Sequence, residues 1–176
     1  PRGEVPIHIA AIGPQMLKMA GDVGDGLVVS FGVPPLLVEQ ELEHVAGGLE
    51  MSGRTLDEFE VVAYIVTAPQ INSRVREFAA EMIALAEPLL HLDVRDVGIS
   101  LADAEEIREV HETEGVERAA ELTTDEMVKT FAIVGDEASC HDRLDEYVAA
   151  GVDIPVLFHL GPEDPERIVD IGASWL

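Results

Sequence analysis

Basic residues are scarce in this chain. Its 176 residues include 11 lysines and arginines against 35 aspartates and glutamates, which gives a formal net charge of −24. Nucleic acids and anionic membranes are bound through basic patches, so the charge balance disfavours both as partners. Because salt screens the repulsion among surface carboxylates, we expect a halophilic protein that works in concentrated salt. An acidic protein of an ordinary medium is the alternative.

Cysteine is nearly absent as well. Cys140 is the single cysteine, which excludes an internal disulfide and a Cys-x-x-Cys zinc site and favours a cytoplasmic location. No stretch holds 18 consecutive apolar residues, so we expect no membrane span. The carboxylates are spread along predicted helices, which indicates solvated surfaces rather than a metal site.

Familiar catalytic patterns are missing too. No Gly-x-Gly-x-x-Gly follows the first apolar segment, and the sequence neighbours Cys140 and His141 are interpreted as helix residues. No nucleophile and base stand out as a pair, which is typical of an enzyme that leaves its chemistry to a cofactor. Hydrophobic residues make up 47% of the chain, enough for the core of one domain.

Apolar segments alternate with amphipathic ones along the chain. Strands are predicted over residues 4–11, 25–31, 59–67 and 152–160, and helices over 13–21, 34–53, 72–89, 135–151 and 164–176. Residues from about 93 to 130 show no obvious strand and are predicted as a helical insertion with two short helices. Strands that alternate with helices form parallel βαβ units, so the predicted class is α/β.

Capping signals predict several helix starts. The pattern Thr55-x-x-Glu58 is a capping box, and Ser100 and Thr123 are each followed by an acidic residue three positions on. Asp136 and Asp164 are the predicted caps of the last two helices.

Four βα units are half of a (β/α)8 TIM barrel. A half barrel leaves two sheet edges open, so the pattern calls for a second half, from missing residues or from a partner. The chain begins with Pro1 just before a predicted strand, which indicates a segment cut from a longer barrel.

In a barrel, ligands bind where a strand ends and the next helix begins. Gly13 lets the backbone approach a ligand, and Pro14 at a helix start leaves backbone N–H groups directed at an anion. Ser30 and Gly32 end the next strand and offer a hydroxyl and an open backbone to the same anion. Ordinary turn chemistry is the alternative for all four. His159 ends the fourth strand at this edge and is the candidate on the substrate side.

The four histidines other than His141 and His159 are interpreted as structural. His8 lies within the first predicted strand, either lining the barrel or packing under a helix. His44, His91 and His111 are assigned to polar helix surfaces or helix ends, with no role.

The segment PIHIAAIGPQMLKMAGDVGDGLVVS resembles the luciferase-like monooxygenase superfamily, in particular its coenzyme F420-dependent methylenetetrahydromethanopterin reductase branch. Members carry a strand ending in Ala-Ala-x-Gly-Pro, here residues 10–14, and then a short helix with Ala-Gly, here residues 20–21. Asp-Gly opens the next strand, here at residues 25–26. The later segment GDEASCHDRLDEYVAAGVDIPVLFHLGP resembles the last βα unit of the family.

The resemblance implies a (β/α)8 barrel that binds coenzyme F420, or alternatively FMN, at the carboxyl ends of its strands. In that barrel residues 1–176 are the carboxyl-terminal half, strands five to eight, and the amino-terminal half is missing. The cofactor-binding residues implied are Ala11, Ile12, Gly13, Ser30 and Gly32, with Ser30 near the cofactor phosphate. Val33 stands where some members place a phosphate-binding lysine.

The function implied is an oxidoreductase that moves a hydride between reduced coenzyme F420 and a one-carbon-carrying pterin or a related substrate. An FMN-dependent monooxygenase is the alternative among enzymes, and a non-catalytic half-barrel that dimerises through its open edges is the alternative outside them. The catalytic residues are unknown, because the first four strands would supply part of the site. We therefore expect this chain alone to be inactive, and the whole protein to take a small-molecule substrate and to form a homo-oligomer.

Overall fold

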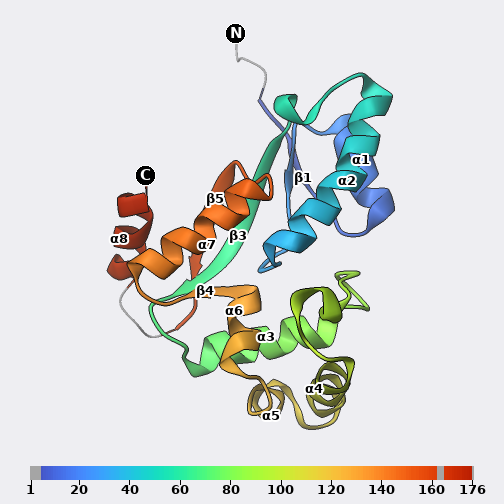
Figure 1. Ribbon diagram of the computed structural model, residues 1–176. Coiled ribbons are helices and arrows are strands. Elements are labelled where there is room, and N and C mark those ends of the chain that lie inside the picture. The colour runs from blue at the N-terminus through green and yellow to red at the C-terminus, as the bar shows by residue number, and fades with distance from the viewer. Residues whose placement is uncertain (1–4, 162–164, 176) are drawn as a thin grey trace.

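A parallel sheet of five strands runs through the molecule (Figure 1). The computed structural model describes residues 5–161 and 165–175. The strands are β1 (His8–Ala10), β2 (Gly26–Val28), β3 (Glu60–Ala68), β4 (Ala132–Val134) and β5 (Ile154–His159). Strand β3 is central, because it pairs with β2, β4 and β5. Strand β5 occupies one edge of β3 from Val62 to Thr67, so β2 and β4 follow one another along the opposite edge.

The four predicted strands are confirmed as β1, β2, β3 and β5. Their spatial order, β1-β2-β3-β5, is the sequential order of neighbouring strands in a (β/α)8 barrel. The prediction of only four strands was wrong, since β4 pairs with the last three residues of β3. Its three residues follow a helix without a break, so the apolar run in the sequence has the length of one more helical turn.

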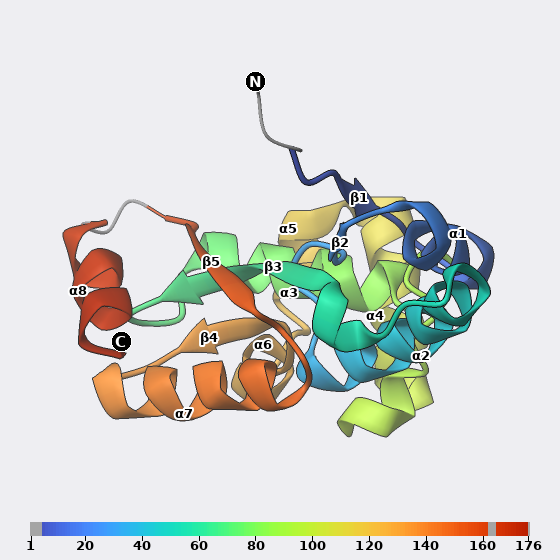
Figure 2. The ribbon, with the colours of Figure 1, turned by 90° about the horizontal axis from the view of Figure 1, so that it is seen from above.

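The helices are α1 (Pro14–Val23), α2 (Pro35–Ser52), α3 (Ser73–Leu85), α4 (Leu101–Glu114), α5 (Val116–Ala120), α6 (Asp125–Phe131), α7 (Glu137–Ala149) and α8 (Glu166–Trp175). Two 3-10 helices, η1 (Leu56–Glu58) and η2 (Val94–Val97), join them. The predicted insertion therefore contains η2, α4, α5 and α6, three of them α-helices where two were expected. Seen from above, α8 and the α1–α2 pair lie at opposite ends of β3, and α7 runs beside β4 (Figure 2). Within the described ranges, no helix is both long and apolar enough to cross a bilayer.

The helix starts follow the capping signals with one exception. Thr55 and Glu58 form the predicted capping box, and Ser100 and Asp136 each accept a hydrogen bond from the backbone N–H three residues on. The predicted cap Thr123 was wrong by one residue. Its buried hydroxyl donates to a carbonyl of the preceding turn, and Thr124 caps α6 instead. The predicted cap at position 164 lies outside the described residues.

Helices α1 and α2 cross at two glycines. A Cβ atom at Gly48 of α2 would overlap the carbonyl oxygen of Lys18, and one at Gly21 of α1 would overlap the carbonyl oxygen of Val45. Each helix thus uses a residue without a side chain where the other backbone passes. The Ala-Gly motif of α1 is therefore a packing requirement, because any side chain there would push the two helices apart.

Arg54 closes the carboxyl end of α1. Its Nη1 donates to the carbonyl of Gly24 at 2.7 Å, and its Nη2 donates to the carbonyls of Gly21 at 2.7 Å and Asp22 at 3.1 Å. The last carbonyls of a helix have no partner within the helix, and a cation there also opposes the helix dipole. Arg54 therefore ties the loop after α2 to the end of α1.

We expect Arg54→Ala to lower the free energy of unfolding by about 2 kcal/mol, because hydrogen bonds from a charged donor to backbone carbonyls are lost. Urea unfolding measures this loss. Arg74→Ala is the matched control, since the Arg74 side chain is 71% exposed and pairs with Glu77, and surface ion pairs contribute little. Equal effects of the two substitutions would contradict a capping role for Arg54.

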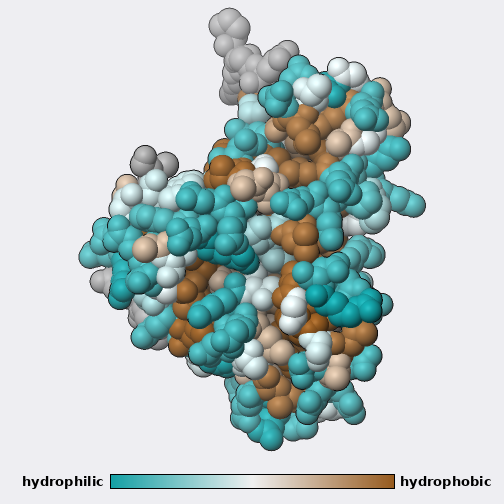
Figure 3. All heavy atoms as spheres, in the orientation of Figure 1, coloured by the Kyte–Doolittle hydropathy of each residue, from teal (hydrophilic) through white to brown (hydrophobic). Residues whose placement is uncertain are grey.

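The two faces of the β3–β5 pair differ in cover. Ala63, Ile65 and Thr67 of β3 are at most 1% exposed on the face that the helices pack against. On the other face Tyr64 and Phe158 are each 40% exposed. We call this second face the inner face, because it corresponds to the interior of a barrel. Hydrophilic residues cover most of the surface seen in Figure 3, and hydrophobic ones show in the furrows between elements.

Candidate functional site

The carboxyl ends of the strands lie at one edge of the sheet, because all strand pairs are parallel. The turns that follow them are residues 11–13 after β1, 29–34 after β2 and 69–72 after β3. The segment after β5 begins at Leu160, whose carbonyl accepts a hydrogen bond from Nδ2 of Asn72 at 3.1 Å. Asn72 also caps α3, so it joins the end of β5 to the turn after β3.

The turn after β1 leads directly into α1. Ala11 is 4% exposed and fixes the turn in the core, whereas Ile12 is 41% exposed. Gly13 has a φ of +80°, a conformation that L side chains rarely adopt, and Pro14 is the first residue of the helix. The backbone at residues 12–13 is thus held at the sheet edge, as a turn that contacts a ligand through its main chain requires.

The turn after β2 contains a bulge. The N–H of Val29 donates to the carbonyl of Val62, but the next bond to β3 runs from the N–H of Gly32 to the carbonyl of Tyr64. Three residues of one strand therefore face two of the other. Gly32 has a φ of +66°, and a Cβ atom there would overlap the ring of Phe78. Glycine is required at this position for both reasons.

The bulge places the Ser30 hydroxyl against a buried carboxyl. Ser30 is 9% exposed, and its Oγ lies 3.5 Å from Oε1 of Glu41 on α2. Glu41 is only 3% exposed, and its Oε2 has no hydrogen-bond partner within the described part of the chain. Burial raises the pKa of Glu41 to about 7, although the hydrogen bond from Ser30 acts in the opposite direction.

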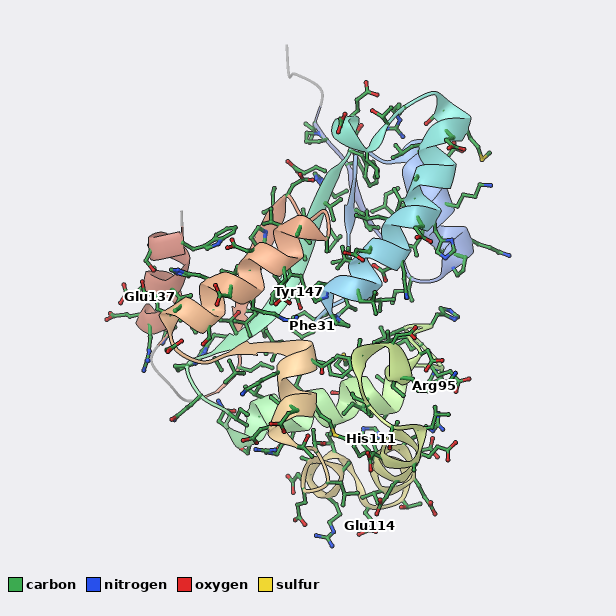
Figure 4. The ribbon with its side chains drawn as sticks, viewed as in Figure 1. Phe31, Arg95, His111, Glu114, Glu137 and Tyr147 are labelled. Carbon is green, nitrogen blue, oxygen red and sulfur yellow. The ribbon has the colours of Figure 1, made fainter. Side chains whose placement is uncertain are left out.

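Three phenylalanines meet beside these turns, and we call Phe31, Phe78 and Phe158 the aromatic cluster. The ring of Phe31 is edge-to-face with Phe78, at 5.4 Å between centroids, and with Phe158, at 5.0 Å. Figure 4 shows Phe31 near the start of α2, next to Tyr147 of α7. Phe31 and Phe158 remain 38% and 40% exposed. The cluster therefore offers a rigid apolar surface where β2 and β5 end.

Val33 lies in the core rather than at a surface. It is 2% exposed, and its carbonyl accepts a hydrogen bond from the Tyr147 hydroxyl at 2.8 Å. Burial raises the pKa of Tyr147 to about 12, so the phenol stays protonated and keeps donating. The position where some family members have a lysine therefore offers no cation here.

His159 follows Phe158 in β5 and points to the other face. Its register partner is Thr67, which is fully buried on the helix-covered face. Nδ1 of His159 is itself buried. Phe158, rather than His159, thus faces the interior side of the sheet, and a substrate contact through His159 stays a prediction.

The structure brings part of the predicted site together. Gly13 and Gly32 follow neighbouring strands, and the aromatic cluster joins the second turn to the end of β5. Ser30 lies at the expected turn, but its hydroxyl is buried against Glu41, so its role at a cofactor phosphate stays a prediction. The sequence contained a signal for Glu41, because the spacing 37, 41, 45 puts it on the apolar stripe of α2.

One residue at this edge was assigned no role from the sequence. His91 lies in the loop after α3, and its Nε2 would lie 3.1 Å from a Cβ atom at Gly13. No local pattern could indicate this neighbour, since the two positions are 78 residues apart in the chain. His8, by contrast, contacts another strand of the sheet, because its Nε2 lies 2.6 Å from Oε2 of Glu60 on β3.

A parallel sheet in barrel order, with an open inner face and glycine turns at its carboxyl edge, defines one half of a (β/α)8 barrel with its ligand-facing end. The chain belongs to the luciferase-like monooxygenase family, whose model matches residues 1–154.

Two curated relatives and one solved structure are similar to the chain. The chain is 28% identical over 176 residues to the 5,10-methylenetetrahydromethanopterin reductase of Methanopyrus kandleri, covering 97% of this chain and 50% of that protein. It is 27% identical over 173 residues to an F420-dependent glucose-6-phosphate dehydrogenase of Mycolicibacterium gilvum, covering 97% and 47%. The solved structure of the coenzyme F420 dependent tetrahydromethanopterin reductase from Methanopyrus kandleri superposes with a TM-score of 0.75 at 26% identity, covering 96% and 49%. The chain spans about half the length of the relatives it matches.

Proposed function

We propose that this chain is the carboxyl-terminal half of a coenzyme F420-dependent oxidoreductase and supplies one wall of its cofactor site. The observation that carries the proposal is the glycine turn after β1, held at the ligand-facing edge of a half barrel. The glucose-6-phosphate dehydrogenase and the solved reductase act on different classes of substrate, and both are named as F420-dependent. What they share is the cofactor, so the cofactor is the best supported part of the proposal.

The residues present fit such a ligand. Gly13 and Gly32 have positive φ and leave the main chain open at the turns after β1 and β2. Ile12 and the aromatic cluster provide exposed apolar surface next to them. We assign the turns at residues 11–13 and 30–32 to holding the cofactor and the cluster to excluding water beside it. The bound deazaflavin supplies the chemistry, which is hydride transfer.

For the substrate we propose a one-carbon-carrying pterin or a related compound with a flat ring, rather than a sugar phosphate. Val33 is buried, so this position provides no cation for a substrate phosphate. The neighbouring exposed side chains of the aromatic cluster are apolar. Flat ring systems pack on such surfaces, whereas a phosphate requires a cationic or hydrogen-bonding partner.

The open inner face supports a further part of the proposal. Parallel sheets are normally covered on both faces, and here Tyr64, Ile154 and Phe158 are about 40% exposed on one of them. We propose that the first four strands of the barrel cover this face in the whole protein, and that residues 1–176 alone are inactive. A homo-oligomer that works in the cytoplasm in concentrated salt completes the proposal.

Titration of the whole protein with coenzyme F420, followed by fluorescence in molar KCl, tests the cofactor. We expect saturable binding, and then oxidation or reduction of the coenzyme with a methylene-pterin substrate but not with glucose 6-phosphate. Binding of FMN in place of coenzyme F420, with oxygen consumption, would establish the monooxygenase alternative. A stable dimer of residues 1–176 with affinity for neither cofactor would favour the non-catalytic half barrel.

A further inference from the structure

His91 has an unusual backbone conformation. Its φ is +56°, and it is the one non-glycine residue with positive φ in the described ranges. Non-glycine residues with positive φ have a strained backbone. Such residues concentrate at ligand sites, where the surrounding structure holds them in place. Two features of His91 follow from this conformation: the contacts that hold its backbone and the direction of its imidazole.

The neighbours of His91 fix its conformation. Leu90 and Leu92 on either side are 5% and 0% exposed, so both are anchored in the core. Their N–H groups donate to the carbonyls of Leu85 and Ala86, which continues the end of α3 into a tight turn. Because both flanking side chains point inward, the imidazole between them is left exposed at the surface of the turn.

The exposed imidazole lies at the predicted cofactor turn. Its Nε2 and Cδ2 would lie 3.1 and 3.5 Å from a Cβ atom at Gly13, so the ring sits over the one position of that turn that has no side chain. Within residues 5–161 and 165–175, no hydrogen bond or ion pair holds the ring. A polar group on strained backbone, directed at a glycine turn and not used by the fold, is placed to meet a ligand.

His91 also lines a cavity. Its volume is about 580 Å³, and residues of α3, η2 and α4 line it together with His91. Arg95 and Arg108 are two of its lining residues, in a chain that has only nine arginines. Figure 4 shows Arg95 on the loop between α3 and α4. His91 thus borders both this cavity and the turn after β1.

We propose that His91 is a ligand-binding residue whose imidazole hydrogen-bonds the cofactor held at the Gly13 turn. This inference rests on the proposed function, since it requires a cofactor at that turn. It adds to that function a side chain from the loop between α3 and the helical insertion, 78 residues away in the chain. The loop that leads from α3 into the insertion is thereby part of the cofactor site.

Three variants of the whole protein separate binding from folding. His91→Gly removes the imidazole but accepts positive φ, and His91→Asn keeps an N–H donor in a residue that tolerates this conformation. His44→Ala is the control, because His44 is an exposed histidine on α2. Each is titrated with coenzyme F420 by fluorescence, and its melting temperature is measured without cofactor.

We expect His91→Gly to weaken coenzyme binding about tenfold without lowering the melting temperature. His91→Asn should stay within about threefold of the unchanged protein, and His44→Ala should bind as the unchanged protein does. Unaltered binding by His91→Gly, or weakened binding only in step with a lower melting temperature, would overturn the role of His91. If the unchanged protein binds FMN instead, the same comparison is made with FMN, and the role of His91 is decided there. Binding of neither cofactor would refute the proposed function and, with it, the role of His91.

Discussion

Replacing Gly48 with alanine is expected to separate α1 from α2 and to lower the free energy of unfolding by about 3 kcal/mol. The added Cβ would overlap the carbonyl oxygen of Lys18, which belongs to the backbone and cannot rotate away. Overpacking a core usually costs about 1–3 kcal/mol, and a clash between two backbones lies at the upper end of that range. Gly21→Ala should behave alike, because the overlap there is with the carbonyl oxygen of Val45.

Gly47→Ala provides the control, at the position just before Gly48 in the same helix. No atom lies within 4 Å of a Cβ atom at Gly47. Alanine is favoured over glycine inside a helix by about 1 kcal/mol, so this variant should be more stable than the unchanged protein. Urea unfolding of the variants measures the loss of stability expected for Gly48→Ala and the gain expected for Gly47→Ala in one experiment. If Gly48→Ala were as stable as Gly47→Ala, the close crossing of α1 and α2 would be refuted.

Glu41→Gln is expected to stabilise the protein by about 3 kcal/mol at pH 8.5 and hardly at all near pH 4.5. Burial raises the pKa of Glu41 from 4.5 to about 7 in the folded state. Between these values the folded protein binds a proton that the unfolded chain releases, so stability falls as the pH rises. The difference is fully developed above pH 7, at about 1.4 kcal/mol for each pKa unit.

Glutamine has the shape of the protonated acid and removes the charge at every pH. The unfolding free energies of the Glu41→Gln variant and of the unchanged protein should therefore converge toward pH 4.5, separate as the pH rises to 7, and differ by a constant amount above neutrality. Glu43→Gln is the control, because this carboxylate lies on the same helix and is exposed. A stability difference for Glu41→Gln that is the same at pH 5 and pH 8.5 would contradict a buried, protonated carboxyl.

Local signals predicted most of the helix boundaries. The capping box at Thr55 and Glu58 and the caps Ser100 and Asp136 act through atoms three residues away, so the sequence contains the whole interaction. Thr123 shows the limit of such a signal. Its hydroxyl bonds backward to the preceding turn, and that competing partner decided in favour of Thr124 as the cap.

Strand β4 could not be predicted because it forms through pairing with β3, a segment distant in the sequence. Three apolar residues form a strand only because the end of β3 offers an unoccupied edge there. The α1–α2 crossing is intermediate between the two cases. The Ala-Gly motif was visible, but its partner Gly48 is 27 residues away, and only packing shows that both are required.

The sequence by itself determined the class of fold, the half-barrel order of its strands and the glycine turns after the first two strands. These follow from hydrophobic periodicity and from backbone conformations open only to glycine, both of which are properties of short segments. Only the tertiary structure decided that Ser30 faces Glu41, that Phe158 rather than His159 faces the inner side, and that His91 lies over Gly13. Each of these depends on a partner from a distant segment, and on the bulge, the register and the anchored loop that bring the two together.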